Sequence, residues 1–181
     1  ISVLHNTDSS FEITLSGQPG IQNNLGTTWQ LESSIDSIKL TLSNTDTTKT
    51  FNLYGIILEQ QDNVFQYHTI GVNGSMAKSY LKCDLFDTHL ARLNPNLVII
   101  SLGTNEAFDK NFTKDDFIIN FSNLISKIRN SCPDAVMIIT TPNDHYKDGQ
   151  INRNVEFVRE SIYHLKNYFD FGIWDFYESM G

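Results

Sequence analysis

Two short polar stretches carry groups that could stabilise a developing negative charge. In VIISLGTNEAFD, residues 98–109, an apolar run ends in Gly103, and Asn105 follows it closely. In GVNGS, residues 71–75, glycines again follow a strand-like stretch and precede a helical pattern. Glycine lets backbone N–H groups approach a ligand, and the Asn amide is a further donor. Two such donors aimed at one point form an oxyanion hole, which stabilises the tetrahedral intermediate of acyl transfer.

The elements around these loops alternate between strand and helix over residues 67–181. Apolar β-formers predict four strands, in FQYHTI, NLVIISLG, AVMIITTP and FGIWDFY. The second and third are continuous apolar runs, which are typical of strands buried on both faces of a parallel sheet. The order β-α-β-α-β-α-β predicts an α/β fold with a flavodoxin-like parallel sheet flanked by helices.

Helical spacing of apolar residues predicts the helices between these strands. The first covers residues 76–93, and Thr113 with Asp116 approximates a capping box at the start of the second. The apolar stripe of the second helix is Phe117, Phe121, Leu124, Ile125 and Ile128, and that of the third is Ile151, Val155, Val158 and Ile162.

Ligands bind beyond the carboxyl ends of the strands in sheets of this kind. The loops at that edge are residues 71–75, 103–109 and 142–149, together with the segment after Asp175. Either glycine loop alone would be an ordinary turn between a strand and a helix. Because matching donors follow two consecutive strands, the sequence favours an oxyanion site over two unrelated turns.

Residues 1–66 have a different pattern and predict a separate antiparallel β unit. They are rich in Ser, Thr and Asn, and their apolar residues recur with period two. SFEITLSG places Phe11, Ile13 and Leu15 on one face, SIKLTLSN repeats the pattern, and TFNLYGIILEQ is a third, more apolar strand. No helix is expected there. The chain is therefore predicted to divide into a β unit, 1–66, and an α/β part, 67–181.

Composition excludes several classes of partner. The 181 residues carry a net charge of −8, and 40% of them are hydrophobic, which is enough for a core. The acidic balance argues against binding to nucleic acid or to an anionic membrane surface. No window is apolar for long enough to span a bilayer, and ISVLHNTDSS lacks the pattern of a signal peptide.

The two cysteines, Cys83 and Cys132, are both expected to be buried thiols. A disulfide framework would need more cysteines in a shorter chain. No Cys or His pair has the spacing of a zinc site, so no such metal site is expected.

The two loop motifs resemble blocks II and III of the SGNH (GDSL-type) hydrolases, in the bacterial esterase branch with a β-rich insertion. YHTIGVNGS followed by LVIISLGTNEAFD carries this resemblance, which covers about residues 64–181. It implies that the backbone N–H of Gly74 and the side chain of Asn105 are the oxyanion donors of a serine esterase that uses no cofactor. The implied substrate is a carbohydrate or lipid ester, with glycan O-acetyl groups favoured, and the implied location is periplasmic, cell-surface or secreted.

Two blocks of that family are missing from this sequence. The nucleophile belongs to a Gly-Asp-Ser motif, and the nearest string is TDSS, residues 7–10, which a strand pattern follows. The last block, Asp-x-x-His, is missing because Glu178 stands three residues after Asp175. Glu106 replaces the usual Asp of block III and is expected to hydrogen-bond the turn. We therefore interpret the chain as an incomplete esterase, inactive alone, with the β unit as an insertion.

In the family's sheet the strand of the missing nucleophile block lies between the strands of blocks II and III. Its loss would leave unpaired sheet edges. We expect residues 1–6, a neighbouring chain or another partner to supply a complementing strand there, or the remaining parallel strands to close up directly.

Other polar and aromatic residues allow a second interpretation. Asp144 and His145, at a strand's carboxyl end, are candidates for contact with substrate, or are solvated loop residues. Trp29 and Tyr54 could form a sugar-binding platform on the β unit, or fill a small core. The alternative function is a non-catalytic carbohydrate-binding module with a degenerate hydrolase-like domain.

Overall fold

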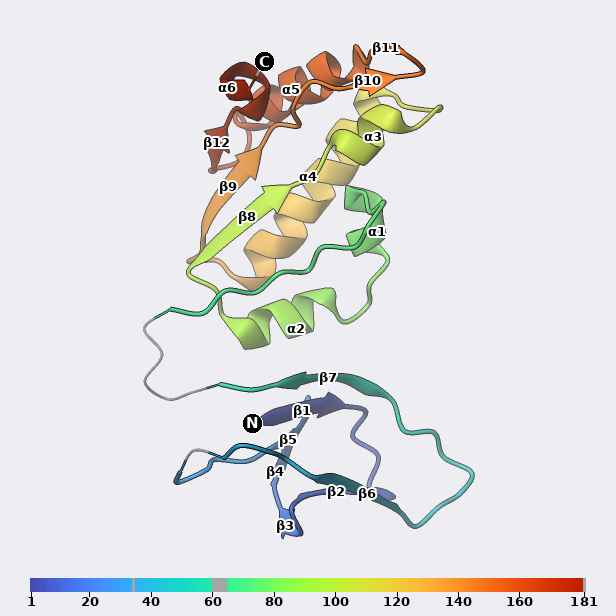
Figure 1. Cartoon of the computed structure of the whole chain (residues 1–181), viewed down its shortest axis with the longest axis vertical. Helices are drawn as coiled ribbons and strands as arrows, with labels where there is room; N and C mark the ends of the chain where they lie inside the picture. The colour runs from blue at the N-terminus through green and yellow to red at the C-terminus, as the bar shows by residue number, and fades with distance from the viewer. Residues whose placement is uncertain (34, 60–64, 181) are drawn as a thin grey trace. The chain divides into compact units, whose positions relative to one another are not determined.

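The computed structural model describes residues 1–33, 35–59 and 65–180, and the chain divides into two compact units, Ile1–His68 and Thr69–Gly181. Within the described ranges, the first unit contains strands and no helix, whereas the second contains all the helices (Figure 1). Each unit has its own hydrophobic core.

The first unit is built from two antiparallel sheets, ordered β4-β5-β1-β7 and β3-β2-β6. Of its strands, β2, β6 and β7 lie within the three predicted segments, which confirms those predictions, whereas β1, β3, β4 and β5 were not predicted. The bounds are β1 Ser2–His5, β2 Phe11–Leu15, β3 Gln18–Pro19, β4 Ile21–Asn23, β5 Gly26–Thr28, β6 Leu40–Asn44 and β7 Leu53–Ile57.

Trp29 belongs to the core of this unit. Its side chain is only 6% exposed and packs with Ile13 and Leu15, while its indole N–H donates to the Gln18 carbonyl at 3.0 Å. Of the two alternatives for Trp29, filling a small core is therefore confirmed, and the sugar platform is excluded because a buried indole offers no face to a ligand. Tyr54 is 45% exposed, on the edge strand β7.

The second unit confirms the predicted fold class, an α/β fold with a parallel sheet flanked by helices. Its sheet has the order β12-β9-β8, and both pairings are parallel. A two-stranded hairpin, β10 and β11, lies outside this sheet. The bounds are β8 Leu97–Ser101, β9 Val136–Thr140, β10 Tyr146–Lys147, β11 Gln150–Ile151, β12 Gly172–Trp174, α1 Ala77–Leu81, α2 Phe86–Leu93, α3 Thr104–Phe108, α4 Lys114–Ser131, α5 Asn154–Leu165 and α6 Phe176–Met180.

Helix α4 is the element that the sequence specifies best. Its N-cap, Thr113, accepts a hydrogen bond from the Asp116 backbone N–H at 3.1 Å, and the Thr113 hydroxyl donates to the Asp116 carboxylate at 2.7 Å. The predicted apolar stripe is buried throughout, and it forms the centre of the core together with residues of β8, β9 and α5.

Three other helix and strand boundaries differ from the prediction. The helix expected over residues 76–93 is broken into α1 and α2 at residues 82–85, where Cys83 and Asp84, both weak helix formers, interrupt it. Helix α5 begins at Asn154, because Ile151 belongs to the hairpin and is 60% exposed. Strand β12 ends at Trp174, and after Asp175 the last two residues of FGIWDFY enter α6.

The predicted strand FQYHTI is absent, because residues 65–70 are exposed and form no strand. A strand is stable only when its backbone N–H and C=O groups are paired. Strand β8 lies at the edge of its sheet and pairs with β9 alone among the described strands. Residues 1–6 do not complete that edge, since β1 pairs with β5 and β7. Within the described ranges, neither residues 1–6 nor a second parallel strand fills the gap, and a complementing strand from a neighbouring chain or another partner stays a prediction.

The two faces of the β8-β9-β12 sheet are unequally covered. Ile100, Met137 and Ile139 are at most 5% exposed and pack against α4 and α5. Their neighbours Leu97, Ile99, Val136 and Trp174, which alternate with them along the strands, are 47% to 62% exposed. Thr140, on the same face, is 6% exposed. Apart from the end of β9, the second face is thus largely bare over the part of the chain that the structure describes, although parallel sheets are normally covered on both faces. We call it the bare face.

Candidate functional site

The two glycine loops meet at the carboxyl edge of the sheet. Gly103 ends the strand segment, and α3 begins immediately after it, so Asn105 lies in the first turn of that helix. The Asn105 side-chain amide donates to the Ser75 carbonyl at 2.8 Å. The structure therefore brings the GVNGS and GTNE motifs into direct contact.

Gly103 is required by both backbone conformation and packing. Its φ of +119° lies in a region that L side chains rarely adopt, and a Cβ placed there would come within 2.8 Å of Val158 in α5. Glycine thus allows β8 to turn sharply into α3 while α5 packs close beneath the turn. The sequence predicted the turn, whereas the short helix α3 after it was not predicted.

Glu106 fixes both loops from inside. Its carboxylate is buried and accepts hydrogen bonds from the backbone N–H of Ala77 at 2.8 Å and of Gly103 at 3.0 Å. One side chain therefore ties the start of α1 to the turn after β8. The expectation that Glu106 hydrogen-bonds this turn is confirmed, and its additional bond to α1 was not foreseen.

Gly74 lies in a turn in which the Ser75 N–H donates to the Val72 carbonyl at 3.0 Å. Gly74 is exposed and has φ +76°, so the turn uses the conformational freedom of glycine. The Ser75 hydroxyl lies 3.1 Å from the Tyr80 hydroxyl, which donates to the Ile70 carbonyl. The hydroxyl contact between Ser75 and Tyr80 thus links the turn to α1, while Gly74 itself is exposed.

The Asn105 amide retains donor capacity in this arrangement. A primary amide has two N–H bonds, and the Ser75 carbonyl accepts one of them. The side chain is half-buried, so its remaining donor has a defined direction. The fixed amide beside a glycine turn is an arrangement that can bind an oxyanion, and the assignment of Gly74 and Asn105 as its donors stays a prediction.

His145 is held by its surroundings. Its ring stacks on Phe108, with 4.5 Å between the ring centroids and 8° between the ring planes. The Asn152 amide donates to Nε2 at 3.0 Å, so Nδ1 carries the proton and donates to the Asn143 carbonyl at 3.2 Å. These contacts give His145 a positional role, whereas the neighbouring Asp144 is exposed. Contact of Asp144 and His145 with substrate stays a prediction.

Asn152 is a residue that the sequence reasoning missed. It is 7% exposed and donates both to His145 and to the Ala107 carbonyl, at 3.0 Å each. It thereby joins the 142–149 loop to α3. Nothing in its local sequence distinguishes it from other loop asparagines, because its partner in α3, Ala107, is distant along the chain.

Asp175 follows β12 and is engaged by three side chains. It accepts hydrogen bonds from Thr141 at 2.9 Å, Arg159 at 2.8 Å and Tyr163 at 2.9 Å. Burial raises the pKa of Asp175, but these hydrogen bonds outweigh burial and hold the pKa below its ordinary value. Asp175 also accepts from the Glu178 N–H at 3.3 Å, at the start of α6. Asp175 thus connects the end of β12 to α5 and α6 through hydrogen bonds.

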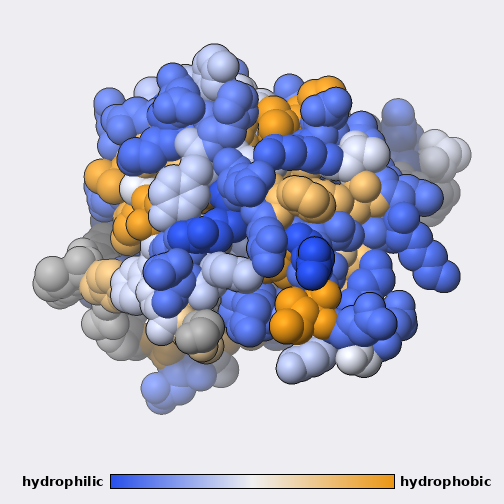
Figure 2. Space-filling model, turned by 90° about the horizontal axis from the view of Figure 1, so that it is seen from above, coloured by the Kyte–Doolittle hydropathy of each residue, from blue (hydrophilic) through white to orange (hydrophobic). Residues whose placement is uncertain are grey.

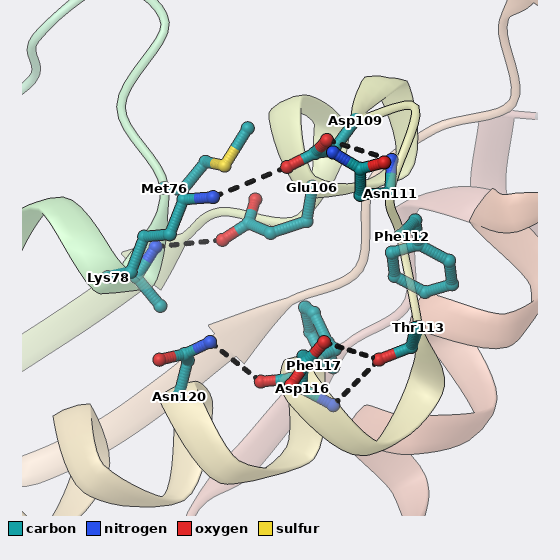
Figure 3. A pocket seen from close by; sticks show the side chains of 11 residues that line it. Met76, Lys78, Glu106, Asp109, Asn111, Phe112, Thr113, Asp116, Phe117 and Asn120 are labelled. Carbon is teal, nitrogen blue, oxygen red and sulfur yellow. Dashed lines mark hydrogen bonds and ion pairs between the residues drawn. The ribbon is translucent and has the colours of Figure 1, made fainter.

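A pocket lies next to the loop junction, on its α4 side. Its volume is about 300 Å³, and Glu106 is part of its lining. Figure 3 shows Lys78 reaching Asp109, an ion pair of 3.3 Å, and the capping pair at the start of α4. Its lining residues are Met76, Ala77, Lys78, Glu106, Asp109, Asn111, Phe112, Thr113, Asp116, Phe117 and Asn120. Neither Gly74 nor Asn105 is among them, so this pocket is separate from the predicted donors.

The cysteines and the metal-binding groups take no part in this site. Cys132 is buried as expected, and burial raises the pKa of its thiol. Cys83 is exposed, which contradicts the prediction, because it lies in the break between α1 and α2. Among the described residues, no cluster of three His, Cys, Asp or Glu could hold a metal ion, and no helix is long and apolar enough to span a bilayer.

Comparison with known proteins gives matches at the level of structure only. No family model matches the chain, and no curated protein sequence matches it. A solved structure of a peptidoglycan O-acetylesterase is similar, with a TM-score of 0.70 and 21% identity over 99% of this chain. A family two carbohydrate esterase from Clostridium thermocellum, solved with cellohexaose, has a TM-score of 0.38 and 24% identity over 48% of this chain, and 26% of that chain is covered.

The first likeness establishes the fold, and the second is too weak to add to it. The chain spans 52% of the length of the peptidoglycan O-acetylesterase that it matches. About half of that solved chain therefore lies outside the part in common.

Proposed function

We propose that this chain is the oxyanion-hole part of an SGNH-type serine esterase that removes acyl groups from a carbohydrate or lipid, with an O-acetylated glycan as the favoured substrate. Asn105 and the backbone N–H of Gly74 are the donors in this proposal. The observation that carries it is the bond from the Asn105 amide to the Ser75 carbonyl, because it joins the two predicted donor loops at the carboxyl edge of a parallel sheet.

In this mechanism the hydroxyl of a Ser adds to the acyl carbon while a His takes its proton. The carbonyl oxygen becomes an oxyanion, to which Asn105 and Gly74 donate hydrogen bonds. The sugar or lipid alcohol then leaves with the proton from His, and water releases the acyl group from Ser. No metal or cofactor enters these steps.

The Ser and the His are proposed to come from a complementing segment that supplies a strand beside β8. That edge of β8 pairs with no described strand, and Gly103 and Asn105 follow the end of β8. A parallel strand added there would end beside these donors, where its own loop could present a nucleophile. The proposed location, periplasmic, cell-surface or secreted, follows from the glycan substrate.

The structure supports this proposal better than a non-catalytic carbohydrate-binding module. The binding proposal relied on an exposed aromatic platform in the first unit, and Trp29 is buried there. No other observation in the described part of that unit favours a sugar site.

The test is hydrolysis of p-nitrophenyl acetate by two proteins, residues 1–181 alone and the complete product of the gene. Residues 1–181 should show no turnover, because a hole without a nucleophile performs no acyl transfer. The complete product should turn over, and Asn105→Ala should lower its kcat by about 100- to 1,000-fold. Asn167→Ala, a substitution of an exposed asparagine after α5, is the matched control and should leave kcat unchanged.

Absence of turnover by the folded complete product would contradict the esterase proposal. Equal activity of the Asn105→Ala variant and the parent would contradict the role of Asn105 while leaving the reaction class standing.

A further inference from the structure

The last residues of the three parallel strands form a row at the carboxyl edge of the sheet. Ser101 is aligned with Thr140, and Thr140 with Trp174. Residues in register on neighbouring strands project from the same face, and the Thr140 hydroxyl confirms this by donating to the Ser101 hydroxyl at 3.0 Å. Trp174 is 59% exposed, so the row presents an indole beside two hydroxyls.

A pocket of about 210 Å³ opens next to this row. Its polar side carries hydroxyls and one carboxamide, and its apolar side includes Phe176, whose ring centroid lies 5.8 Å from that of Trp174. The lining residues are Ser101, Leu102, Thr104, Thr140, Thr141, Pro142, Asn143, Phe176 and Met180. Its volume is below the range of about 300–1,000 Å³ for drug-sized ligands, so it has room for a single ring.

The polar groups of the pocket suit a neutral ligand with several hydroxyls. Ser101 accepts the bond from Thr140 and keeps its own proton to donate, while the Thr140 oxygen can still accept. Thr141 is committed, because it donates to Asp175 and accepts from the Tyr177 N–H at 3.1 Å. Asn143 donates to the Asp144 carbonyl at 2.9 Å and keeps its amide oxygen as an acceptor.

Charge excludes the other small ligands that such a pocket might take. None of its lining residues is basic, and the chain has a net charge of −8, so a phosphate or sulfate would find no counter-charge. None of the lining residues is acidic either, which argues against a cation. A sugar combines hydroxyls with an apolar ring face, and it therefore matches the hydroxyl row and the exposed indole together.

We propose that this pocket, together with Trp174 beside it, binds one pyranose ring of a neutral glycan, with the apolar face of the ring against Trp174 and its hydroxyls on Ser101, Thr140 and Asn143. Trp174 does not line the pocket itself, and its place beside the pocket follows from its register with Thr140 and its ring contact with Phe176, which both line it. The inference rests on the proposed function in one respect, since it names the glycan part of the proposed ester. Thr104 lines the pocket and precedes Asn105, so the bound ring is a neighbour of the proposed oxyanion donor. Figure 2, seen from above relative to Figure 1, shows a mostly hydrophilic surface with separate hydrophobic patches.

The experiment measures binding by residues 1–181, without any requirement for turnover. The probes are the β-1,4-linked trimers of N-acetylglucosamine and of glucose, titrated into the millimolar range. The chain has two tryptophans, and Trp29 is buried, so a change in tryptophan fluorescence reports mainly on Trp174. Isothermal titration calorimetry measures the same binding in variants that lack the indole.

We expect saturable binding of at least one trimer, and a Kd raised about tenfold or more by Trp174→Ala, because an aromatic stacking partner is worth about that factor. Ser101→Ala should raise Kd by a smaller factor. Tyr168→Ala, which removes an exposed aromatic after α5, is the matched control and should leave Kd unchanged. Circular dichroism establishes that each variant is folded.

Failure of both trimers to bind the folded chain overturns the inference, and so does binding that Trp174→Ala leaves unchanged. The outcome is separable from that of the esterase test. Glycan binding without turnover by the complete gene product would contradict the proposed function alone, whereas turnover without binding at this pocket would contradict the sugar subsite alone.

Discussion

The two faces of the β8-β9-β12 sheet are made by alternate residues of the same strands, yet their environments are opposite. Ile100 is 5% exposed and packs with α4 and α5, whereas its neighbour Ile99 is 55% exposed. Both belong to one continuous apolar run. The difference shows that the apolar composition of a strand does not reveal whether one or both faces of its sheet are covered. That depends on which other segments of the protein pack against the sheet.

The covered face and the bare face are suited to different tasks. Burial on the covered face provides the free energy that holds the second unit together. The bare face borders the free edge of β8, so the complementing segment proposed above would meet apolar side chains and unpaired backbone groups at one place. The carboxyl edge, where both faces end, carries the proposed oxyanion donors and the proposed sugar pocket.

The largest expected effect comes from truncating the same residue type on each face. Ile139→Ala on the covered face, where Ile139 is fully buried, should lower the free energy of unfolding by about 2–5 kcal/mol. Ile99→Ala on the bare face should lower it by less than about 1 kcal/mol. Denaturant titration followed by the fluorescence of Trp174, which lies in this unit, measures both values.

Equal decreases in the free energy of unfolding for the two variants would contradict the difference between the faces, because they would mean that Ile99 is as well packed as Ile139. Trp29 lies in the other unit, and a Trp29→Phe background removes its signal from the titration.

A smaller, pH-dependent effect is expected at the joint between β12 and α5. The pKa of Asp175 is lowered in the folded chain, so its contribution to stability is complete above the unfolded value of about 3.9 and is lost as pH falls through the folded value. Asp175→Asn should therefore lower the free energy of unfolding by about 1–2 kcal/mol at pH 7. The difference from the parent should shrink below about pH 4.

Asp170→Asn is the matched control, since Asp170 is exposed and its carbonyl, rather than its carboxylate, accepts from Arg129. That substitution changes the net charge equally and should have little effect at either pH. If the Asp175→Asn loss were the same at pH 3 and pH 7, the ionised carboxylate would not be the group that stabilises the joint.

Helix α4 could be predicted because its determinants are local. Thr113 and Asp116 form the cap, and the apolar spacing that follows defines the buried stripe. Residues 65–70 show the opposite case, since their β-forming side chains specify a strand only if another strand is available to pair with them. The break between α1 and α2 is a third case, because the weak helix formers Cys83 and Asp84 interrupt a helix that the spacing of apolar residues had predicted to continue, and Cys83 is exposed there.

The sequence predicted which loops form the candidate site, but it did not predict the hydrogen bonds that hold these loops together. The loops containing Ser75 and Asn105 were expected to meet because both would follow parallel strands ending at one edge. They do meet, although the strand expected before the first loop is absent, so their contact depends on the hydrogen bonds of Asn105 and Glu106. The Glu106 carboxylate accepts from the Ala77 N–H, and the Asn152 amide donates to the Ala107 carbonyl, and both bonds join residues far apart in the chain. Such contacts depend on the distances between folded elements, and a single sequence does not state those distances.

The last prediction concerns the exposed apolar side chains of the bare face, whose replacement should change dye binding clearly and stability very little. Replacing Leu97 and Ile99 together by Ser should reduce the binding of an apolar fluorescent dye, because these side chains form an exposed apolar patch on the bare face. The free energy of unfolding should change by less than about 1 kcal/mol. Ile119→Ser with Phe157→Ser, substitutions of exposed residues on α4 and α5, is the matched pair and should leave more dye bound. If both pairs lowered dye binding equally, the bare face would bind the dye no better than scattered apolar residues on the helices. That result would contradict the claim that this face carries an apolar patch suited to a complementing segment.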